Sequence, residues 1–274
     1  MKCINSTMQK YSINKLERLK GKLKKMNKVA VGFSGGVDSS FLLKILSDVL
    51  GKNTLAITIK SPAHPKSEIE EALRIVGSMN VKHEIIDLDI TESSEFKKNN
   101  IDRCYYCKKM IFSKIKDVAK KDDIDYVVDA SNANDLDDYR PGMKALKEIG
   151  IISPLIDVNL TKKEIRDLSR HLNLDTWNKP SFACLASRFP YEIEISKVRL
   201  KQVEKAEMFL NSLGLIELRV RYHNEIARIE VPKPAFQTVL KYSKEITKQF
   251  KKFGFKYVTL DIEGYRSGSL NEVL

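Results

Sequence analysis

Long hydrophobic segments are missing from this sequence of 274 residues. No apolar run is long enough to span a bilayer, and residues 1–28 contain no hydrophobic signal segment. We therefore expect a cytoplasmic protein with no membrane partner. The chain also lacks G-x-x-x-x-G-K-[ST] and G-x-G-x-x-G, which excludes a Walker-type nucleotide site and the dinucleotide-binding fingerprint.

Cysteine and histidine are scarce, with four residues of each. So few cysteines in a cytosolic chain indicate metal binding or catalysis rather than a disulfide framework. The histidines are scattered without ligand spacing, and we assign them no role.

Acidic residues are outnumbered by Lys and Arg, 36 against 48, which gives a net charge of +12. Residues 1–28 hold nine of these basic residues against one Glu, on a segment whose apolar positions describe one face of a helix: Ile13, Leu16, Leu19 and Leu23. A second basic run covers residues 241–256. Such patches attract nucleic acid in some proteins, but we favour a solvated lysine-rich surface and expect no nucleic-acid partner.

The most informative stretch is residues 29–40. A short apolar strand (29–33) runs into Ser-Gly-Gly-Val-Asp-Ser-Ser (34–40), and an apolar helix pattern (41–50) follows. Two adjacent glycines permit a tight turn and a close approach of the backbone to a ligand. The unpaired N–H groups and the dipole of the following helix favour an anion. The loop therefore predicts a phosphate or pyrophosphate site.

The rest of the chain alternates strands and helices, which predicts an α/β fold: a parallel sheet with helices on both faces, and ligands beyond the carboxyl ends of the strands. We expect a first domain over residues 1–178, including a basic N-terminal helix over 1–28, and a smaller C-terminal α+β domain over 179–274. The expected strands are 29–33, 53–59, 81–88, 125–129, 151–156, 215–222, 226–231 and 255–262. The expected helices are 41–50, 66–79, 104–120, 141–149, 161–172, 196–213 and 234–250, with Thr161 and Glu164 forming a capping box.

An acid-rich loop, residues 129–142, follows the strand 125–129 at the same rim as the phosphate loop. Its carboxylates suit Mg²⁺, and Arg140 suits a phosphate or carboxylate.

Three cysteines form a second signal: Cys104 and Cys107 make a C-x-x-C at the start of a helix, and Cys184 lies in the loop between the two domains. One C-x-x-C without a second pair is a poor structural zinc site, and a thioredoxin-like dithiol would leave Cys184 idle. Three thiolates can hold a [4Fe-4S] cluster and leave one iron open for an extra sulfide. Cys3, in the basic segment, is given no role.

The S-G-G-V-D-S pattern resembles the PP-loop of the N-type ATP pyrophosphatases, in which Asp38 would contact Mg²⁺. Five ordered blocks together resemble the LarE family of ATP-dependent sulfur transferases, which build the nickel-pincer nucleotide cofactor of lactate racemase. The blocks are 34–40, 131–142, 179–191, 214–231 and 260–268, and the resemblance covers roughly residues 14–268. It implies an adenine nucleotide alpha hydrolase-like PP-loop domain.

The resemblance also implies a reaction. ATP adenylates a carboxylate of pyridinium-3,5-dicarboxylate mononucleotide with release of pyrophosphate, and sulfur then displaces AMP. The implied cofactors are ATP, Mg²⁺ and, because Cys104 and Cys107 depart from the single-cysteine pattern, a [4Fe-4S] cluster. The implied partners are the substrate mononucleotide, an upstream carboxylase/hydrolase, a downstream nickel insertase and a sulfide donor, with the protein expected as a homo-oligomer.

The resemblance assigns roles to particular positions. Residues that would hold pyrophosphate and Mg²⁺ are Ser34, Gly35, Gly36, Asp38, Ser39 and Ser40, with Arg140 in the nucleotide-side loop. Residues near the substrate nucleotide are Ser187, Arg188, Arg219 and Arg221, and acidic positions for a metal are Glu207 and Glu230. Cys184 matches the sulfur-donating position of single-cysteine members, whereas Cys104, Cys107 and Cys184 together match the cluster ligands of three-cysteine members. Whether sulfur comes from Cys184 itself or from a cluster stays open.

Two other functions use a similar loop. A tRNA-thiolating enzyme also joins it to cysteines, but its three-cysteine branch usually has Lys where Val37 stands, and the chain has no added zinc ribbon or recognised RNA-binding domain. An amide-forming synthetase of the GMP- or NAD-synthetase kind shares S-G-G-V-D-S but needs ammonia and no cysteine.

Overall fold

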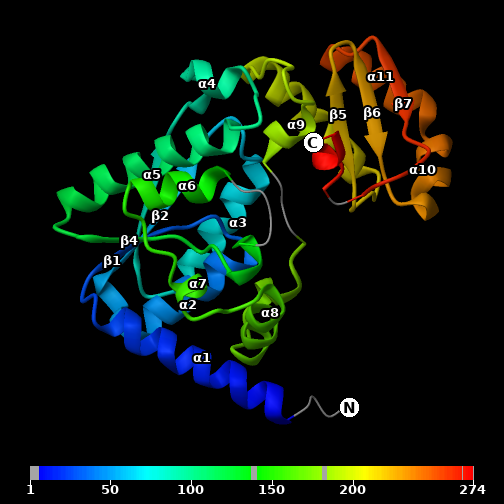
Figure 1. Cartoon of the computed structure of the whole chain (residues 1–274). Coiled ribbons are helices and arrows are strands. Elements are labelled where there is room, and N and C mark those ends of the chain that lie inside the picture. The colour runs from blue at the N-terminus through cyan, green and yellow to red at the C-terminus, as the bar shows by residue number, and fades with distance from the viewer. Residues whose placement is uncertain (1–5, 137–140, 181–183, 267, 274) are drawn as a thin grey trace. The chain divides into compact units, whose positions relative to one another are not determined.

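The computed structural model describes residues 6–136, 141–180, 184–266 and 268–273. The described residues divide into two compact units (Figure 1). The first takes those within Met1–Ser61, Lys66–Leu88 and Cys104–Phe182, and the second those within Pro62–Pro65, Asp89–Arg103 and Ala183–Leu274. The second unit thus draws two short segments from the N-terminal half of the chain, and the boundary expected after residue 178 stays a prediction. Among the described residues, no helix is both long and apolar enough to cross a membrane.

The first unit is built on a parallel sheet with the strand order β3-β2-β1-β4. The strands are β1 (Val29–Gly32), β2 (Thr54–Lys60), β3 (Lys82–Asp87) and β4 (Tyr126–Val128). Val29 and Val31 of β1 belong to one apolar cluster and Ala30 to another, because successive side chains of a strand point to opposite faces. The predicted α/β fold with a parallel sheet is confirmed.

Helices cover both faces of this sheet (Figure 1). One apolar cluster contains residues of α1 (Ser6–Lys24), α2 (Val37–Leu50), α3 (Lys66–Gly77), α7 (Pro154–Asp157) and α8 (Lys162–His171). The other contains residues of α5 (Arg103–Lys121) and α6 (Pro141–Glu148), among them Phe112, Ile115 and Leu146. The capping box expected at Thr161 and Glu164 is present at the start of α8.

The N-terminal helix α1 has one buried face. Leu19 and Leu23 are fully buried, and Leu16 is nearly so. The ammonium of Lys15, itself buried, lies 2.8 Å from Oε1 of Glu164 and donates to the carbonyl oxygen of Asn159 at 2.5 Å. The basic segment therefore packs against the sheet domain and presents only its remaining lysines to solvent.

The second unit contains a small mixed sheet, ordered β5-β6-β7. Its strands are β5 (Arg219–His223), β6 (Ile226–Glu230) and β7 (Tyr257–Leu260); β5 and β6 are antiparallel, whereas β6 and β7 are parallel. Its helices are α4 (Ser94–Lys97), α9 (Lys197–Ser212), α10 (Phe236–Lys241) and α11 (Ser243–Phe253). Rings of Phe189, Tyr222, Phe250 and Phe255 form its aromatic core. The 3₁₀ helices of the two units are η1 (Gly51–Asn53), η2 (Ile90–Glu92), η3 (Ala133–Leu136), η4 (Asp175–Asn178), η5 (Leu185–Arg188), η6 (Lys233–Ala235) and η7 (Ser269–Val273).

Two expected elements are wrong. Residues 151–156 do not form a strand: only Ile152 pairs, in a single bridge with Val128, and Pro154 then begins α7. Proline suits the first position of a helix because its φ is already helical and its missing N–H would have no helical partner there. The helix expected over 234–250 is two helices, because the backbone of Tyr242 (φ −96°, ψ 15°) leaves the helical region between α10 and α11.

Candidate active site

The loop between β1 and α2 has the geometry of an anion site. Gly35 has φ +70°, and a Cβ there would lie 3.1 Å from both Cα and Cβ of Ala72, so only glycine fits between the loop and α3. Gly36 caps α2 without any side-chain hydrogen bond to the first helical N–H groups. Ser34 and Ser39 brace the turn: their hydroxyl oxygens lie 3.1 Å apart, and Ser39 Oγ donates to the Gly36 carbonyl oxygen at 3.1 Å.

Asp38, in the first turn of α2, has one engaged and one unengaged oxygen. Lys162 Nζ donates to Oδ2 at 2.6 Å, whereas Oδ1 is buried and has no hydrogen-bond partner among the described residues. The hydroxyl of Ser40 is also buried without a partner there. Burial raises the pKa of Asp38, against the opposing effect of the Lys162 ammonium. A buried oxygen without a partner is costly, and a carboxylate oxygen beside an anion site suits Mg²⁺.

A second lysine supports the loop from below. Lys179 Nζ donates to the Gly35 carbonyl oxygen at 3.2 Å and pairs with Glu68 at 2.9 Å and Glu71 at 2.7 Å. Lys179 is nearly buried, and burial raises the pKa of Glu68 against the effect of this lysine. The sequence assigned no role to Lys162 or Lys179. The one available signal was that Lys179 opens the 179–191 block.

The loop after β4 lies at the carboxyl end of the sheet, as expected. Asp129 is buried and accepts hydrogen bonds from Ser131 N at 3.2 Å and Ser153 Oγ at 2.5 Å. The side chain of Asn134 accepts a hydrogen bond from the backbone N–H of Lys162 at 2.9 Å, which joins this loop to the start of α8. The other candidate of the loop, Arg140, lies outside the described residues.

The C-x-x-C pair lies at the same rim. Phe112 of α5 packs so closely on Gly32, the last residue of β1, that a Cβ at Gly32 would lie 2.9 Å from its ring. One turn earlier, Lys108 reaches the Asp129 carboxylate beyond the end of β4, at 3.4 Å. A further turn, about 6 Å along the axis, leads to Cys104, which is exposed, while Cys107 is partly buried. Both cysteines therefore lie beyond the carboxyl ends of the strands.

The third cysteine belongs to the second unit. Cys184 is partly buried and precedes η5, and its carbonyl oxygen accepts from Ser187 N at 2.9 Å and Arg188 Nη1 at 3.2 Å. The Arg188 side chain is fully buried, and its guanidinium makes two parallel bonds of 2.9 Å to Glu207. This bidentate geometry is the strong form of an arginine–carboxylate pair, and it fixes the segment after Cys184 onto α9.

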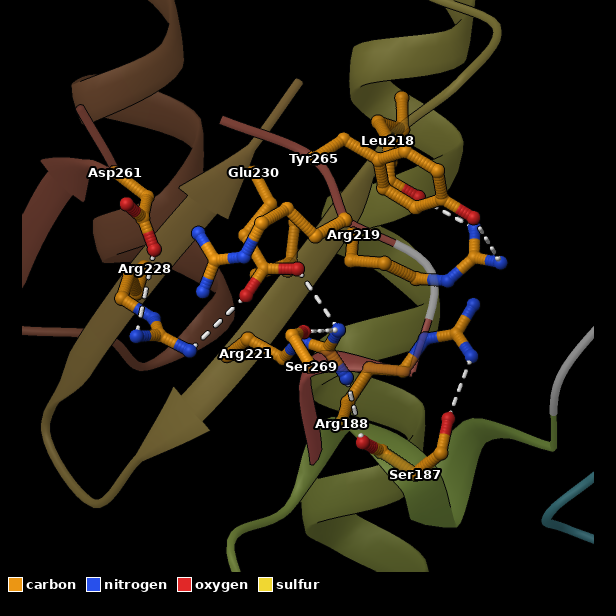
Figure 2. A network of polar contacts seen from close by, with 12 residues as sticks. Ser187, Arg188, Leu218, Arg219, Arg221, Arg228, Glu230, Asp261, Tyr265 and Ser269 are labelled. Atoms are coloured by element: carbon orange, nitrogen blue, oxygen red, sulfur yellow. Dashed lines mark hydrogen bonds and ion pairs between the residues drawn. The ribbon is translucent and has the colours of Figure 1, made fainter. Parts of the chain in front are cut away.

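Further arginines lie on the adjacent strands (Figure 2). Arg221 donates to Glu230 at 2.8 Å and to the Ser187 carbonyl oxygen at 2.8 Å. Arg228 donates to the other oxygen of Glu230 at 3.0 Å. Arg219 donates instead to its neighbour's carbonyl oxygen, that of Leu218, at 2.6 Å, and to the Tyr265 hydroxyl at 3.3 Å. The structure thus brings together Ser187, Arg188, Glu207, Arg219, Arg221 and Glu230.

Glu207 and Glu230 are both occupied by arginines, and their assignment as metal ligands stays a prediction. Within the described ranges, no group of three or more His, Cys, Asp or Glu residues is arranged to hold a metal ion. Cys104 and Cys107 belong to the first unit and Cys184 to the second, so the ligation of a cluster also stays a prediction.

Comparison with known proteins separates the loop from the whole chain. The NAD synthase family model matches residues 12–115, which include the sheet strands β1 to β3 and the phosphate loop. The pyridinium-3,5-bisthiocarboxylic acid mononucleotide synthase of Lactiplantibacillus plantarum is 38% identical over 253 residues, covering 92% of this chain and 92% of that protein.

Two uncharacterised proteins are similar over the same extent. One, of Synechocystis sp., is 40% identical over 263 residues, covering 95% of this chain and 98% of that protein. The other, of Methanocaldococcus jannaschii, is 35% identical over 258 residues, covering 93% and 98%. These similarities extend past the phosphate loop into the arginine-rich second unit.

Proposed function

This chain belongs to the pyridinium-3,5-bisthiocarboxylic acid mononucleotide synthase (LarE) family, and we propose that it converts the carboxylates of pyridinium-3,5-dicarboxylate mononucleotide to thiocarboxylates. Its family and its PP-loop domain make it an ATP-dependent enzyme. The observation that carries the proposal is the joining of two features in one chain. An anion loop with an unpartnered Asp38 oxygen occurs in a chain similar to the synthase over 92% of its length.

Activation of the substrate is the task of the first unit. A carboxylate is a poor electrophile, so its oxygen attacks the α-phosphorus of ATP, pyrophosphate leaves, and a mixed anhydride with AMP results. Gly35, Gly36 and the serines of the loop would bind the leaving pyrophosphate through N–H and O–H donors. Asp38 Oδ1 would ligate Mg²⁺, whose charge stabilises the leaving oxygens. Lys162, which pairs with Asp38, would remain beside the phosphates as a second cation.

Recognition of the substrate nucleotide is the task of the second unit. Arg188 and Arg221 are paired with carboxylates, so they order the strand and the η5 turn around Ser187. Arg219 has no carboxylate partner among the contacts of the described residues. A guanidinium presents several N–H donors in a plane that matches a phosphate, and Arg219 would bind the phosphate of the mononucleotide.

Sulfur delivery is assigned to the cysteines. Cys104, Cys107 and Cys184 would hold a [4Fe-4S] cluster, which would supply a sulfide at the iron that no protein thiolate ligates. The donor set fits, since Cys104 and Cys107 are one turn apart on α5, where residues three apart are neighbours. Cys184 alone is the other source: its own sulfur would be transferred, and the protein would act once. Iron and sulfide analysis with Mössbauer spectroscopy of anaerobically prepared protein decides between them, because iron-free protein that still turns over would refute the cluster.

The expected partners follow from the chemistry of substrate and product. A carboxylase/hydrolase must supply the dicarboxylated mononucleotide, a nickel insertase would take the dithio product, and a sulfide donor must renew the transferred sulfur. We further propose a cytoplasmic homo-oligomer, which light scattering after gel filtration tests: a monomer at working concentration would contradict it.

The test of the function is anaerobic incubation with ATP, Mg²⁺ and the dicarboxylated mononucleotide, followed by mass spectrometry. We expect a product in which sulfur replaces oxygen, together with AMP and pyrophosphate. Omission of ATP serves as the control. An amide formed in the presence of ammonium, or AMP formed without any sulfur-containing product, would contradict the proposal.

A further inference from the structure

The polar network of the second unit has one unbalanced charge. Four arginines face three carboxylates in it: Arg188, Arg219, Arg221 and Arg228 against Glu207, Glu230 and Asp261. Arg188 is paired with Glu207, and Arg221 and Arg228 share Glu230, with Asp261 also on Arg228. The remaining positive charge is that of Arg219, which is therefore the place in the network where an added anion is most strongly attracted.

Arg219 is held in place by the C-terminal segment. Its guanidinium carbon lies 5.1 Å from the centre of the Tyr265 ring, and its Nη2 donates to the hydroxyl of that residue at 3.3 Å (Figure 2). An arginine over an aromatic face loses part of its rotational freedom and gains a cation–π contact. Burial and the neighbouring Arg188 lower the pKa of Arg219, which is the signature of a cation that lacks an anion.

The turn before Tyr265 fixes the position of the ring. Gly264 has φ +83°, and a Cβ there would lie 3.0 Å from the carbonyl oxygen of Val231, so this position requires glycine. The Tyr265 N–H donates to the same Val231 carbonyl at 3.0 Å. Farther along the tail, the Ser269 hydroxyl accepts from Arg221 Nη2 at 2.9 Å. The tail thus closes over the strand that carries the arginines.

We propose that Tyr265 is a positioning residue that presents Arg219 to the 5′-phosphate of the substrate mononucleotide. The Tyr265 oxygen accepts from Arg219, so its own O–H hydrogen remains to donate to the same phosphate. Phosphate monoester recognition by a charged, planar donor group is strengthened by pre-ordering that group. This inference rests on the proposed function, because it takes the substrate to be a mononucleotide.

The test compares Tyr265→Leu, which removes the ring and the hydroxyl, with Tyr265→Phe, which removes the hydroxyl only. Tyr257→Leu is the matched control, since Tyr257 is an exposed tyrosine of β7 in the same unit. The ligands are the dicarboxylated mononucleotide, the same nucleoside without its 5′-phosphate, and ATP, each measured by calorimetric titration together with KM and kcat. Far-UV circular dichroism of each variant checks its fold.

For Tyr265→Leu we expect the Kd and KM for the mononucleotide to rise about tenfold while kcat changes less than about twofold, because the ring acts on binding alone. Tyr265→Phe should show a smaller rise, and the nucleoside and ATP should bind to all variants as to the wild type. An equal loss for the nucleoside, a loss for ATP alone, or no loss at all would overturn the inference.

The result also separates this inference from the proposed function. A wild-type protein that does not bind the mononucleotide would refute the proposed substrate. A wild-type protein that binds it with an affinity that Tyr265→Leu leaves unchanged would refute the role of Tyr265 alone.

Discussion

The two oxygens of Asp38 have unlike surroundings. Oδ2 is neutralised by Lys162 at 2.6 Å, while Oδ1 is buried with no hydrogen-bond partner among the described residues. Leaving a buried carboxylate oxygen unsatisfied costs free energy, so such an atom is expected where a ligand completes the arrangement. Asp38 therefore links the local strand–loop–helix geometry to the chemistry of ATP.

Replacing Asp38 by Asn should abolish ATP use. The amide keeps the shape of the side chain but loses the charge that would hold Mg²⁺, so we expect pyrophosphate release to fall by about 100-fold or more, as when a preorganised electrostatic group is removed. The matched control is Asp48→Asn, an exposed carboxylate of the same helix that pairs only with Lys44 at 2.7 Å. Pyrophosphate release by Asp38→Asn at the rate of the control would contradict the assignment.

Replacing Cys104 or Cys107 by Ala should separate the two sulfur sources. If three thiolates hold a cluster, each variant loses multiple turnover and its iron content falls together with it. If Cys184 donates its own sulfur, each variant keeps a single turnover, and the mass of the protein falls by one sulfur. Quantifying product per protein chain and the intact mass of the protein measures this directly. Variants that keep full multiple turnover would refute the cluster.

Some site residues are visible in the sequence and others are not, for a physical reason. Ser34 to Ser40 form a contiguous motif whose hydrogen bonds are local, so spacing alone indicated it. Lys162 reaches Asp38 across 124 residues, and Lys179 reaches Gly35 across 144. Such pairings depend on how helices pack on the sheet, which residue spacing does not encode.

Among the elements, helix α1 carries more than surface charge. Its apolar face enters the core below the sheet, and Lys15 connects it to Glu164, the capping residue of α8. Since α8 begins at Lys162, the N-terminal helix supports the segment that presents this lysine to Asp38.

Replacing Lys15 by Met should destabilise the fold by about 2–3 kcal/mol, because it leaves the partly buried Glu164 carboxylate without its cation. Burial opposes ionisation of Glu164, but hydrogen bonds from Lys15 and Thr161 outweigh it and keep the pKa of Glu164 below its usual range. The stabilisation is therefore present above the ordinary pKa of a glutamate and is lost as the pH falls through the lowered value.

Urea unfolding at neutral and acidic pH measures this effect, and the difference between wild type and Lys15→Met should shrink on acidification. Lys20→Met is the control, because Lys20 pairs with Glu17 only on the exposed surface. Equal stability of Lys15→Met and the control at neutral pH would show that the Lys15 pair contributes nothing.

Element types followed from the sequence where a segment was long and periodic, and failed where it was short. The alternation of strands and helices predicted the parallel sheet, and S/T-x-x-E predicted the start of α8. Residues 151–156 were apolar enough for a strand, yet Pro154 begins a helical turn there. Helix α2 begins at Val37 rather than at residue 41, because the last residues of the phosphate loop are also its first turn.

Across the whole chain, the chemistry divides between two differently built units. The part that matches NAD synthases, residues 12–115, holds the phosphate loop, so ATP activation is the shared property. The arginine network of the second unit and the three cysteines are what the proposed sulfur insertion adds. Each part has its own test above, and only their joint action on one carboxylate remains to be followed.

Isotope labelling follows that joint action most directly. The carboxylate oxygens of the dicarboxylated mononucleotide are labelled with heavy oxygen, and the AMP formed during anaerobic turnover is analysed by mass spectrometry. Adenylation requires that one labelled oxygen pass from each converted carboxylate to AMP, while sulfur takes its place in the product. AMP without label beside a sulfur-containing product, or ADP and phosphate in place of AMP and pyrophosphate, would contradict the account.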